Sequence, residues 1–110
     1  MTIPGIENAT VEMSKVTDYL LPTTHPDGRS KAEFFMRFGF TSQNKDALIA
    51  ALLKIARDNE VAEVVESAFG TRYVIDGPLQ SPDGRAPAVR TVWIIEAKRP
   101  APRLVTAYPM

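Results

Sequence analysis

The spacing of apolar residues changes near residue 60, and the change divides the chain into a helical part and a part made of strands. Between residues 44 and 59 apolar residues recur at three- and four-residue spacings, opposite two lysines, an arginine and an aspartate, which is typical of an amphipathic helix. Later β-branched and aromatic residues gather in four runs, 61–66, 71–76, 89–96 and 103–108, separated by turns that contain glycine or proline. The pattern predicts a long helix followed by four short strands.

A shorter helix is predicted ahead of the long one, over residues 30–38. Ser30 and Glu33 form a capping-box pattern, in which the Ser30 hydroxyl accepts from the backbone N–H of Glu33 and the Glu33 carboxylate reaches back to the N–H of Ser30. Apolar residues follow at helical spacing, and Gly39 supplies the left-handed residue that commonly ends a helix.

The order of the elements predicts the architecture. Short loops between consecutive strands favour an antiparallel meander, and helices that precede strands favour an α+β fold. We therefore expect two N-terminal helices packed on one face of a four-stranded antiparallel meander sheet, with the other face free to bind a ligand. Residues 1–19 are expected to form an N-terminal arm or an edge strand, and residues 20–110 a single α+β domain.

The composition excludes several classes of protein. Of the 110 residues 45% are apolar and 24% are charged, which is ordinary for one globular domain. The chain has no cysteine and one histidine, so it has no thiolate nucleophile and lacks the residues of a common zinc site. We expect no metal and no cofactor. No apolar run is long enough for a membrane span, and the first twenty residues carry charges where a signal peptide is apolar, so the expected location is cytoplasmic.

The charge is balanced overall but uneven along the chain. Thirteen basic residues face thirteen acidic ones, which argues against a protein that binds nucleic acid through bulk charge. From residue 71 to the end, however, six lysines and arginines face three acidic residues. An anionic ligand is therefore expected to bind in this part of the chain.

The segment before the first helix contains the first group of candidate residues. His25 is the only histidine, and imidazole titrates near neutrality, so it is a candidate general acid or base. The alternative is a loop histidine without a role. Arg29, Ser30 and Lys31 lie at the predicted helix start, where free N–H groups attract anions. The alternative there is a solvated first turn.

Two arginines on the predicted strands are the next candidates. Arg72 lies at the start of the second strand. Arg90 alternates with apolar residues along strand 89–96, so its charge must reach solvent or meet a partner. A carboxylate such as Glu66 or Asp76 and an anionic ligand are equally good partners at this stage.

Hydroxyl and aromatic residues also share rows on the predicted strands. Thr91 and Trp93 form one row of their strand, and Leu104, Thr106 and Tyr108 form one row of the last strand. Such residues can stack bases and hold phosphates. They are equally typical of a half-exposed strand with no ligand.

Three stretches carry a resemblance to a known family: LLPTTHPDGRSKAEFFMRFGF at 20–40, FGTRYVIDGPLQSPDGRAPAVRTVW at 69–93 and PRLVTAYP at 102–109. They resemble a family of small bacterial domains of unknown function (domain of unknown function 6883). The layout of that family is similar to the barnase, EndoU, colicin and RelE class of ribonuclease toxins. The resemblance implies an RNase-like scaffold, an RNA substrate and a small antitoxin or immunity-type partner.

The leading hypothesis is a metal-independent endoribonuclease of a toxin–antitoxin or polymorphic-toxin-related system, acting on tRNA or another structured RNA. The residues assigned to catalysis are His25, Lys31, Arg72, Thr106 and Tyr108. The residues assigned to RNA or phosphate binding are Arg29, Ser30, Arg90, Thr91 and Trp93. The alternatives are a non-catalytic protein-interaction domain that uses the free sheet face or an edge strand, and an enzyme that acts on a small phosphorylated or nucleotide substrate.

Overall fold

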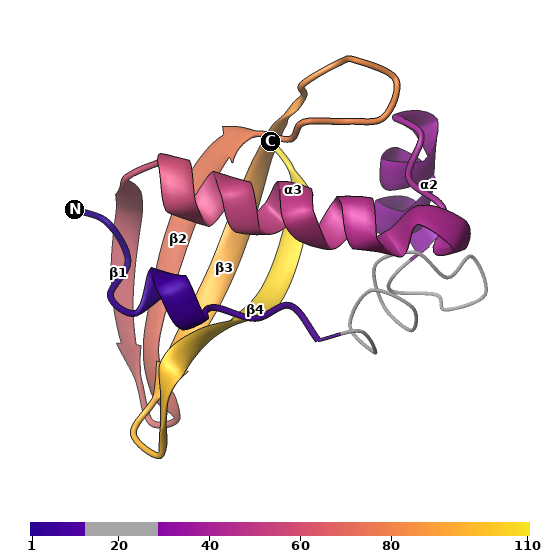
Figure 1. Ribbon diagram of the computed structural model, residues 1–110. Helices are drawn as coiled ribbons and strands as arrows, with labels where there is room; N and C mark the ends of the chain where they lie inside the picture. Colours follow the sequence, from indigo (N-terminus) through magenta and orange to yellow (C-terminus); the bar gives the residue numbers. More distant parts are fainter. Residues whose placement is uncertain (13–28) are drawn as a thin grey trace.

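One long helix crosses one face of a four-stranded sheet (Figure 1). The computed structural model describes residues 1–12 and 29–110, but not the side chains of residues 29–32 and 42. In chain order the elements are η1 (Ile6–Asn8), α2 (Arg29–Arg37), η3 (Ser42–Asn44), α3 (Lys45–Asp58), β1 (Val61–Ser67), β2 (Gly70–Pro78), β3 (Ala88–Glu96) and β4 (Arg99–Pro109).

The sheet has the strand order β1-β2-β3-β4, and each strand is antiparallel to the next. This confirms the α+β fold and the predicted meander. The last strand begins at Arg99 instead of residue 103, although Pro100 and Pro102 interrupt the pattern there. Because β4 is an edge strand, proline residues can be accommodated on its unpaired side.

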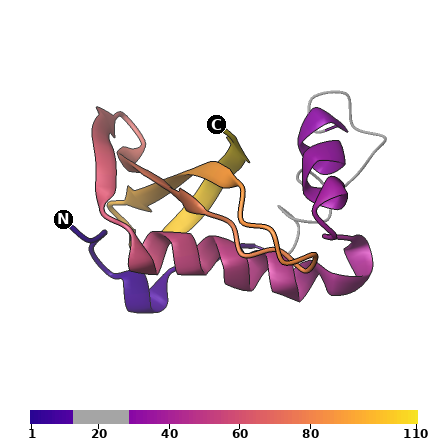
Figure 2. The same ribbon diagram turned by 90° about the horizontal axis from the view of Figure 1, so that it is seen from above.

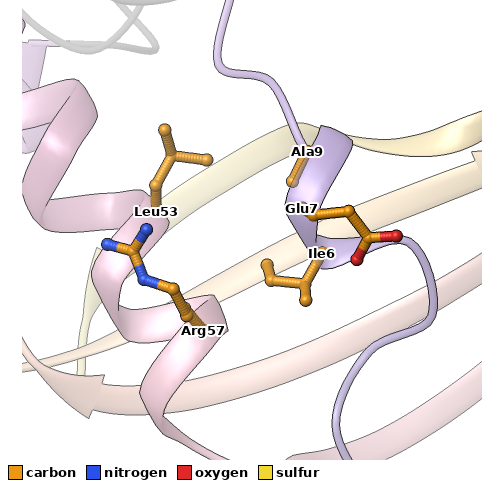
Figure 3. A pocket seen from close by; sticks show the side chains of 5 residues that line it. All are labelled: Ile6, Glu7, Ala9, Leu53 and Arg57. Carbon is orange, nitrogen blue, oxygen red and sulfur yellow. The ribbon is translucent and has the colours of Figure 1, made fainter.

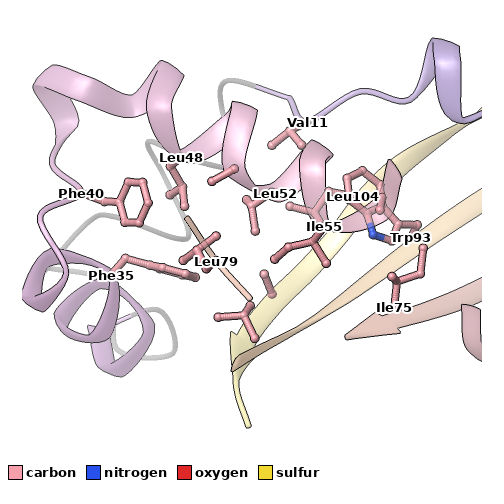
Figure 4. Close-up of a cluster of buried hydrophobic side chains, with 14 of the residues drawn as sticks. Val11, Phe35, Phe40, Leu48, Leu52, Ile55, Ile75, Leu79, Trp93 and Leu104 are labelled. Carbon is pink, nitrogen blue, oxygen red and sulfur yellow. The ribbon is translucent and has the colours of Figure 1, made fainter. Parts of the chain in front are cut away.

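The core lies between α3 and the sheet (Figure 4). The buried residues of α3 follow helical spacing and include Leu48, Leu52 and Ile55, as the sequence pattern predicts. They share a cluster with Ile75 and Trp93 from the centre of the sheet. The apolar side of α3 therefore faces the middle strands.

The shorter helix corrects the expectation that both helices cover one face of the sheet. α3 lies in the middle of the chain and crosses the sheet, whereas α2 stands at the N-terminal end of α3, beside the sheet (Figure 2), and its main contacts with the sheet are to β4. Phe35 and Phe40 join this helix to the core, with ring centroids 6.4 Å apart. Gly39 ends the helix at a φ of 101°, as predicted. The nine-residue helix therefore joins the core at the β4 side of the sheet, through Phe35.

The described N-terminal residues run beside α3 on the same side of the sheet (Figures 1 and 2). The carbonyl of Met1 accepts a 2.7 Å hydrogen bond from the N–H of Val61, at the start of β1. At the other end of this segment, Thr10 forms a single parallel bridge with Arg103 of β4. The segment therefore reaches both edges of the sheet and packs Ile3 into the core.

Candidate functional site

The sheet has one face that no described helix crosses, and most of the described candidate residues lie on it. Strand alternation and the pairing register assign the side chains of each strand to the α3 side or to the opposite side. We call the opposite side the open sheet face. On the three strands β2 to β4 its larger side chains are Arg72, Val74, Asp76, Arg90, Val92, Ile94, Glu96, Arg99, Arg103, Thr106 and Tyr108.

Arg90 is held by a carboxylate on the neighbouring strand. Its Nε donates to Asp76 Oδ1 at 2.8 Å and its Nη2 donates to Asp76 Oδ2 at 2.9 Å. The hydrogen bonds and the charge of Asp76, with a smaller contribution from a hydrogen bond to Tyr108, raise the pKa of Arg90 above its usual range. Of the partners left open by the sequence, the structure selects Asp76. The pair fixes the guanidinium beside the Tyr108 hydroxyl.

Arg103 is held in the same way near the other end of the face. Its Nε and Nη2 each lie 2.8 Å from Glu96 Oε1, and its Nη1 lies 3.9 Å from Glu12 Oε1. Sequence reasoning missed this pair. A β-bulge or irregularity between Ile94 and Glu96 shifts the register there, and alternation alone does not predict such a shift.

Arg72 differs from these two arginines. It is exposed, and within the described residues it has no hydrogen-bond or ion-pair partner. Three of the six basic residues after residue 71 are paired within that part of the chain, Arg85 with Asp83, Arg90 with Asp76 and Arg103 with Glu96. The surplus that remains is Arg72, Lys98 and Arg99, and Arg99 lies on the open sheet face with its Nη1 3.9 Å from Glu12 Oε1. Arg72 is therefore the cation of the open sheet face with most charge available to a ligand.

The floor between these polar groups is apolar. Val74 and Ile94 are 8% and 5% exposed, yet neither belongs to the core cluster on the α3 side. Val92 lies between them, opposite Thr106. At their low exposure Val74 and Ile94 offer little surface for stacking, so the exposed contacts of this face are the arginines and hydroxyls around them.

The last strand contains an irregularity that corrects the predicted row. Thr106 pairs with Val92, whereas Leu104 pairs with Trp93, so Val105 is an extra residue in β4. Leu104 is therefore buried toward α3, while Thr106 and Tyr108 lie on the open sheet face. The expectation of one row for all three residues was wrong because a bulge changes the face of every residue on one side of it.

Thr91 and Trp93 require a second correction. Both are 0% exposed and lie on the α3 side of the sheet. Trp93 Nε1 donates to Thr91 Oγ1 at 2.8 Å, and Thr91 Oγ1 donates to the carbonyl of Ile75 at 2.7 Å. These contacts satisfy the polar atoms of two core residues, so neither side chain can contact RNA.

The remaining candidates precede or begin α2. His25 lies outside the described residues. Arg29, Ser30 and Lys31 begin α2, but their side chains also lie outside the description, so the predicted phosphate site stays a prediction. In the described part of the chain, no group of three or more histidine, cysteine, aspartate and glutamate residues could hold a metal ion.

The spacing of the arginines limits the kind of anion that the open sheet face can bind. Arg72 pairs with Ile94, and Arg90 lies four residues away from Ile94 along β3. At about 3.3 Å per residue, the two arginine positions are roughly 13 Å apart along the sheet. Because Asp76 also holds the guanidinium of Arg90 in place, this spacing suits a chain with several phosphates better than a single phosphate.

A pocket of about 350 Å³ lies on the other side of the sheet, between η1 and α3 (Figure 3). Its lining includes Ile6, Leu53, Glu7 and Arg57. The apolar side chains come from both elements, and the two charges are of opposite sign. For chemistry at phosphorus the described lining offers one carboxylate and one arginine, but no hydroxyl and no second cation.

Comparison with protein-family models then places the chain. The model of the domain of unknown function DUF6883 matches residues 2–110. The chain belongs to this family. A search of the curated proteins finds no significant match.

Comparison with solved structures finds a chain of similar fold. The present chain is similar to a chain of a contact-dependent growth inhibition toxin–immunity protein complex from Klebsiella pneumoniae 342, with a TM-score of 0.74 and 17% sequence identity over 96% of each chain. The likeness shows that the two chains share a fold. Among the described helices of the DUF6883 chain, none is long and apolar enough to cross a membrane.

Proposed function

We propose that this DUF6883 chain is a toxin-like endoribonuclease that acts on tRNA or another structured RNA and is neutralised by a small immunity-type protein. One observation carries the proposal. The open sheet face places Arg72, Arg90 and two hydroxyl residues around an apolar floor, on a fold shared with a chain of a toxin–immunity complex. This arrangement offers contacts for phosphates, riboses and bases on one surface.

The proposed reaction is attack of a ribose 2′-hydroxyl on the adjacent phosphorus, which breaks the bond to the 5′-oxygen of the next nucleotide. It needs a base for the hydroxyl proton, cations around the five-coordinate phosphate and an acid for the leaving oxygen. Each role suits a side chain, so the reaction needs no metal.

The roles follow from the residues. Arg72 contacts the phosphate because its charge is not used by a described carboxylate. Tyr108 positions or protonates the reacting oxygen, with its hydroxyl beside the guanidinium of Arg90, and Thr106 hydrogen-bonds the substrate. His25 as base or acid and Lys31 as a second phosphate contact complete the proposal. Thr91 and Trp93 have no part in it.

The layout favours a polymer over a small substrate. Arg72 and Arg90 are separated by roughly 13 Å along the sheet and Asp76 holds Arg90 in place, so a chain with several phosphates fits both arginines better than a nucleotide with one phosphate. We therefore expect isothermal titration with mononucleotides to give weak binding, and a structured RNA to bind more tightly.

The test is cleavage of tRNA and total RNA by purified protein in the presence of EDTA. We expect the wild type to cleave, and Arg72→Ala and Tyr108→Phe each to lower the cleavage rate at least about a hundredfold by removing a charge contact or a proton-transfer group. Arg57→Ala, which removes an arginine from α3 on the opposite side of the sheet, is the matched control and keeps the wild-type rate.

A specific observation also favours a non-catalytic interaction domain. Asp76 and Glu96 neutralise two of the four arginines on the described part of the open sheet face, which weakens its attraction for RNA. If the purified wild type leaves RNA intact, this second function replaces the first. Growth arrest on induced expression, relieved by co-expression of the neighbouring gene, separates the two in cells.

A further inference from the structure

The first strand presents an edge that the rest of the described chain leaves open. β1 is the outermost strand of the sheet, and six of its seven residues are exposed. Alternate residues of an edge strand direct their N–H and C=O groups away from the sheet, where they can pair with another strand. No described backbone segment forms hydrogen bonds on the outer side of residues 63–67.

The start of the same edge already accepts an extended segment of the chain. The carbonyl of Met1 receives a hydrogen bond from the N–H of Val61, and the register then shifts between Val61 and Glu63. From Glu63 to Ser67 the pairing with β2 is regular. A regular backbone on the inner side implies a regular row of free groups on the outer side.

The side chains of this edge are not those of a protected edge. Val64 and Val65 are 47% and 42% exposed, and Phe69 in the turn after the strand is 75% exposed. Lysine and proline, which commonly prevent edge pairing, are absent from β1. Glu63 and Glu66 are its charged residues, so the edge combines apolar side chains with negative charge.

We propose that β1 binds an extended strand of the immunity-type partner, and that this strand carries the order basic, apolar, apolar, basic. Glu63 and Val65 project on one face of the sheet, and Val64 and Glu66 project on the other. Four consecutive partner residues lie opposite these four positions, so a basic residue meets each glutamate and an apolar residue meets each valine. The proposal rests on the proposed toxin–immunity function.

A second copy of this chain fits the edge less well. An antiparallel pair of two β1 strands keeps the same face of both sheets together, so Val64 can face Val64 or Glu66 but never Val65. In the two registers centred on Val64 or Val65, the glutamates face valine, alanine or serine, and β1 itself contains no basic residue to pair with them. A basic partner supplies this missing charge and keeps the contact between apolar side chains.

The test uses a blocked peptide of eight residues with the central order arginine, valine, valine, lysine, flanked by serine and threonine. The peptide is titrated into the full-length ¹⁵N-labelled protein while two-dimensional NMR spectra are recorded. We expect shift changes at the amides of residues 62–67 and at Phe69, and increased protection of the outer amides from hydrogen exchange. A peptide with glutamate in place of both basic residues binds at least about fivefold more weakly.

Charge reversal on the protein provides the decisive comparison. In the Glu63→Lys/Glu66→Lys variant the preference reverses, so that the glutamate peptide binds better than the basic one. Asp46→Lys/Asp58→Lys changes two exposed charges on α3 by the same amount and keeps the original preference. Far-ultraviolet circular dichroism shows that both variants are folded.

Three results overturn the proposal. The first is the absence of shift changes in β1 at millimolar peptide, and the second is an unchanged preference after charge reversal. The third is sedimentation of the free protein as a dimer that Glu63→Lys/Glu66→Lys dissociates or strengthens, which assigns the edge to a second copy. RNA cleavage is measured separately, so failure of the ribonuclease proposal and failure of the edge proposal give different results.

Discussion

At the scale of single residues, the hydroxyl of Thr91 links the two middle strands inside the core. It accepts a hydrogen bond from Trp93 and donates one to the carbonyl of Ile75. We expect Thr91→Val to lower the free energy of unfolding by about 1–3 kcal/mol, because the buried indole N–H and the carbonyl both lose their partner. Urea denaturation measures the change.

Thr91→Ser keeps the hydroxyl and is the matched control for this change. It should cost less than Thr91→Val, although it removes a methyl group from the core. Neither variant should alter RNA cleavage at a temperature where it is folded, because Thr91 Oγ1 and Trp93 Nε1 are both buried in the core. A Thr91→Val protein as stable as the wild type would contradict the structural role.

At the scale of elements, α3 contributes more buried apolar side chains to the core than any other described helix or strand. Leu52 is 0% exposed in the middle of its buried side. We expect Leu52→Ala to lower the free energy of unfolding by about 2–5 kcal/mol, through lost burial and the cavity that remains. Leu53→Ala, at a half-buried position on the same helix, should cost clearly less in the same denaturation experiment. Equal costs would mean that α3 packs on a different side.

The connection between β2 and β3 ties α2 to the sheet, and this tie depends on pH. Arg85 donates to the backbone carbonyl of Arg37 at 3.1 Å and lies 4.3 Å from the centre of the Phe38 ring. Hydrogen bonds from the Arg85 side chain and backbone lower the pKa of Asp83 below its usual value of 3.8. A lowered pKa in the folded state means that the carboxylate stabilises the fold above the usual value and loses this effect as the pH falls below it.

We therefore expect the melting temperature of the wild type to fall more between pH 5 and pH 3 than that of Asp83→Asn, which has no charge to lose at this position. The same comparison with Asp58→Asn controls for the exposed ion pair with Lys54 on α3, where a hydrogen bond from Lys54 also lowers the pKa of the aspartate. Identical pH profiles for the wild type and Asp83→Asn would show that the contact contributes nothing to stability.

The elements that the sequence predicts well are those whose signal is local. Periodicity predicts α3 and the four strands, and Gly39 predicts the end of α2, because each depends on neighbouring residues only. The bulge at Val105 and the position of α2 depend on packing between distant segments, which a single sequence does not display. The candidate site shows the same difference between what is local and what depends on packing.

Alternation on β3 correctly separates Arg90 from Thr91 and Trp93, but it does not tell which row faces the helix. Trp93 is the largest side chain of the row and fills the space under α3, where Thr91 satisfies its N–H. The apolar row with Val92 and Ile94 therefore remains on the open sheet face. Hydroxyl and aromatic character alone favoured placing Thr91 and Trp93 on the face that binds the ligand.

At the scale of the whole molecule, positive and negative charges balance, and two arginines of the open sheet face are paired with carboxylates. Thirteen basic and thirteen acidic residues give a net charge of zero, and on the described part of the open sheet face Arg72 is the cation without a carboxylate partner. Binding of RNA should therefore depend on a few contacts. This differs from a basic domain, in which many released counterions make affinity fall steeply with salt.

The salt dependence of RNA binding measures the number of these contacts. If Arg72 and the two predicted phosphate residues Arg29 and Lys31 each neutralise one phosphate, the slope of log K against log salt is about −2 for a single strand, since each contact contributes roughly −0.7. Fluorescence anisotropy with a 2′-O-methyl RNA, which lacks the attacking hydroxyl, measures binding without cleavage. Arg72→Ala should make the slope shallower by about 0.7, whereas Arg57→Ala should leave it unchanged. A slope near −5 would mean that RNA binds through a larger basic surface than the open sheet face provides, and an unchanged slope in Arg72→Ala would remove Arg72 from the phosphate contacts.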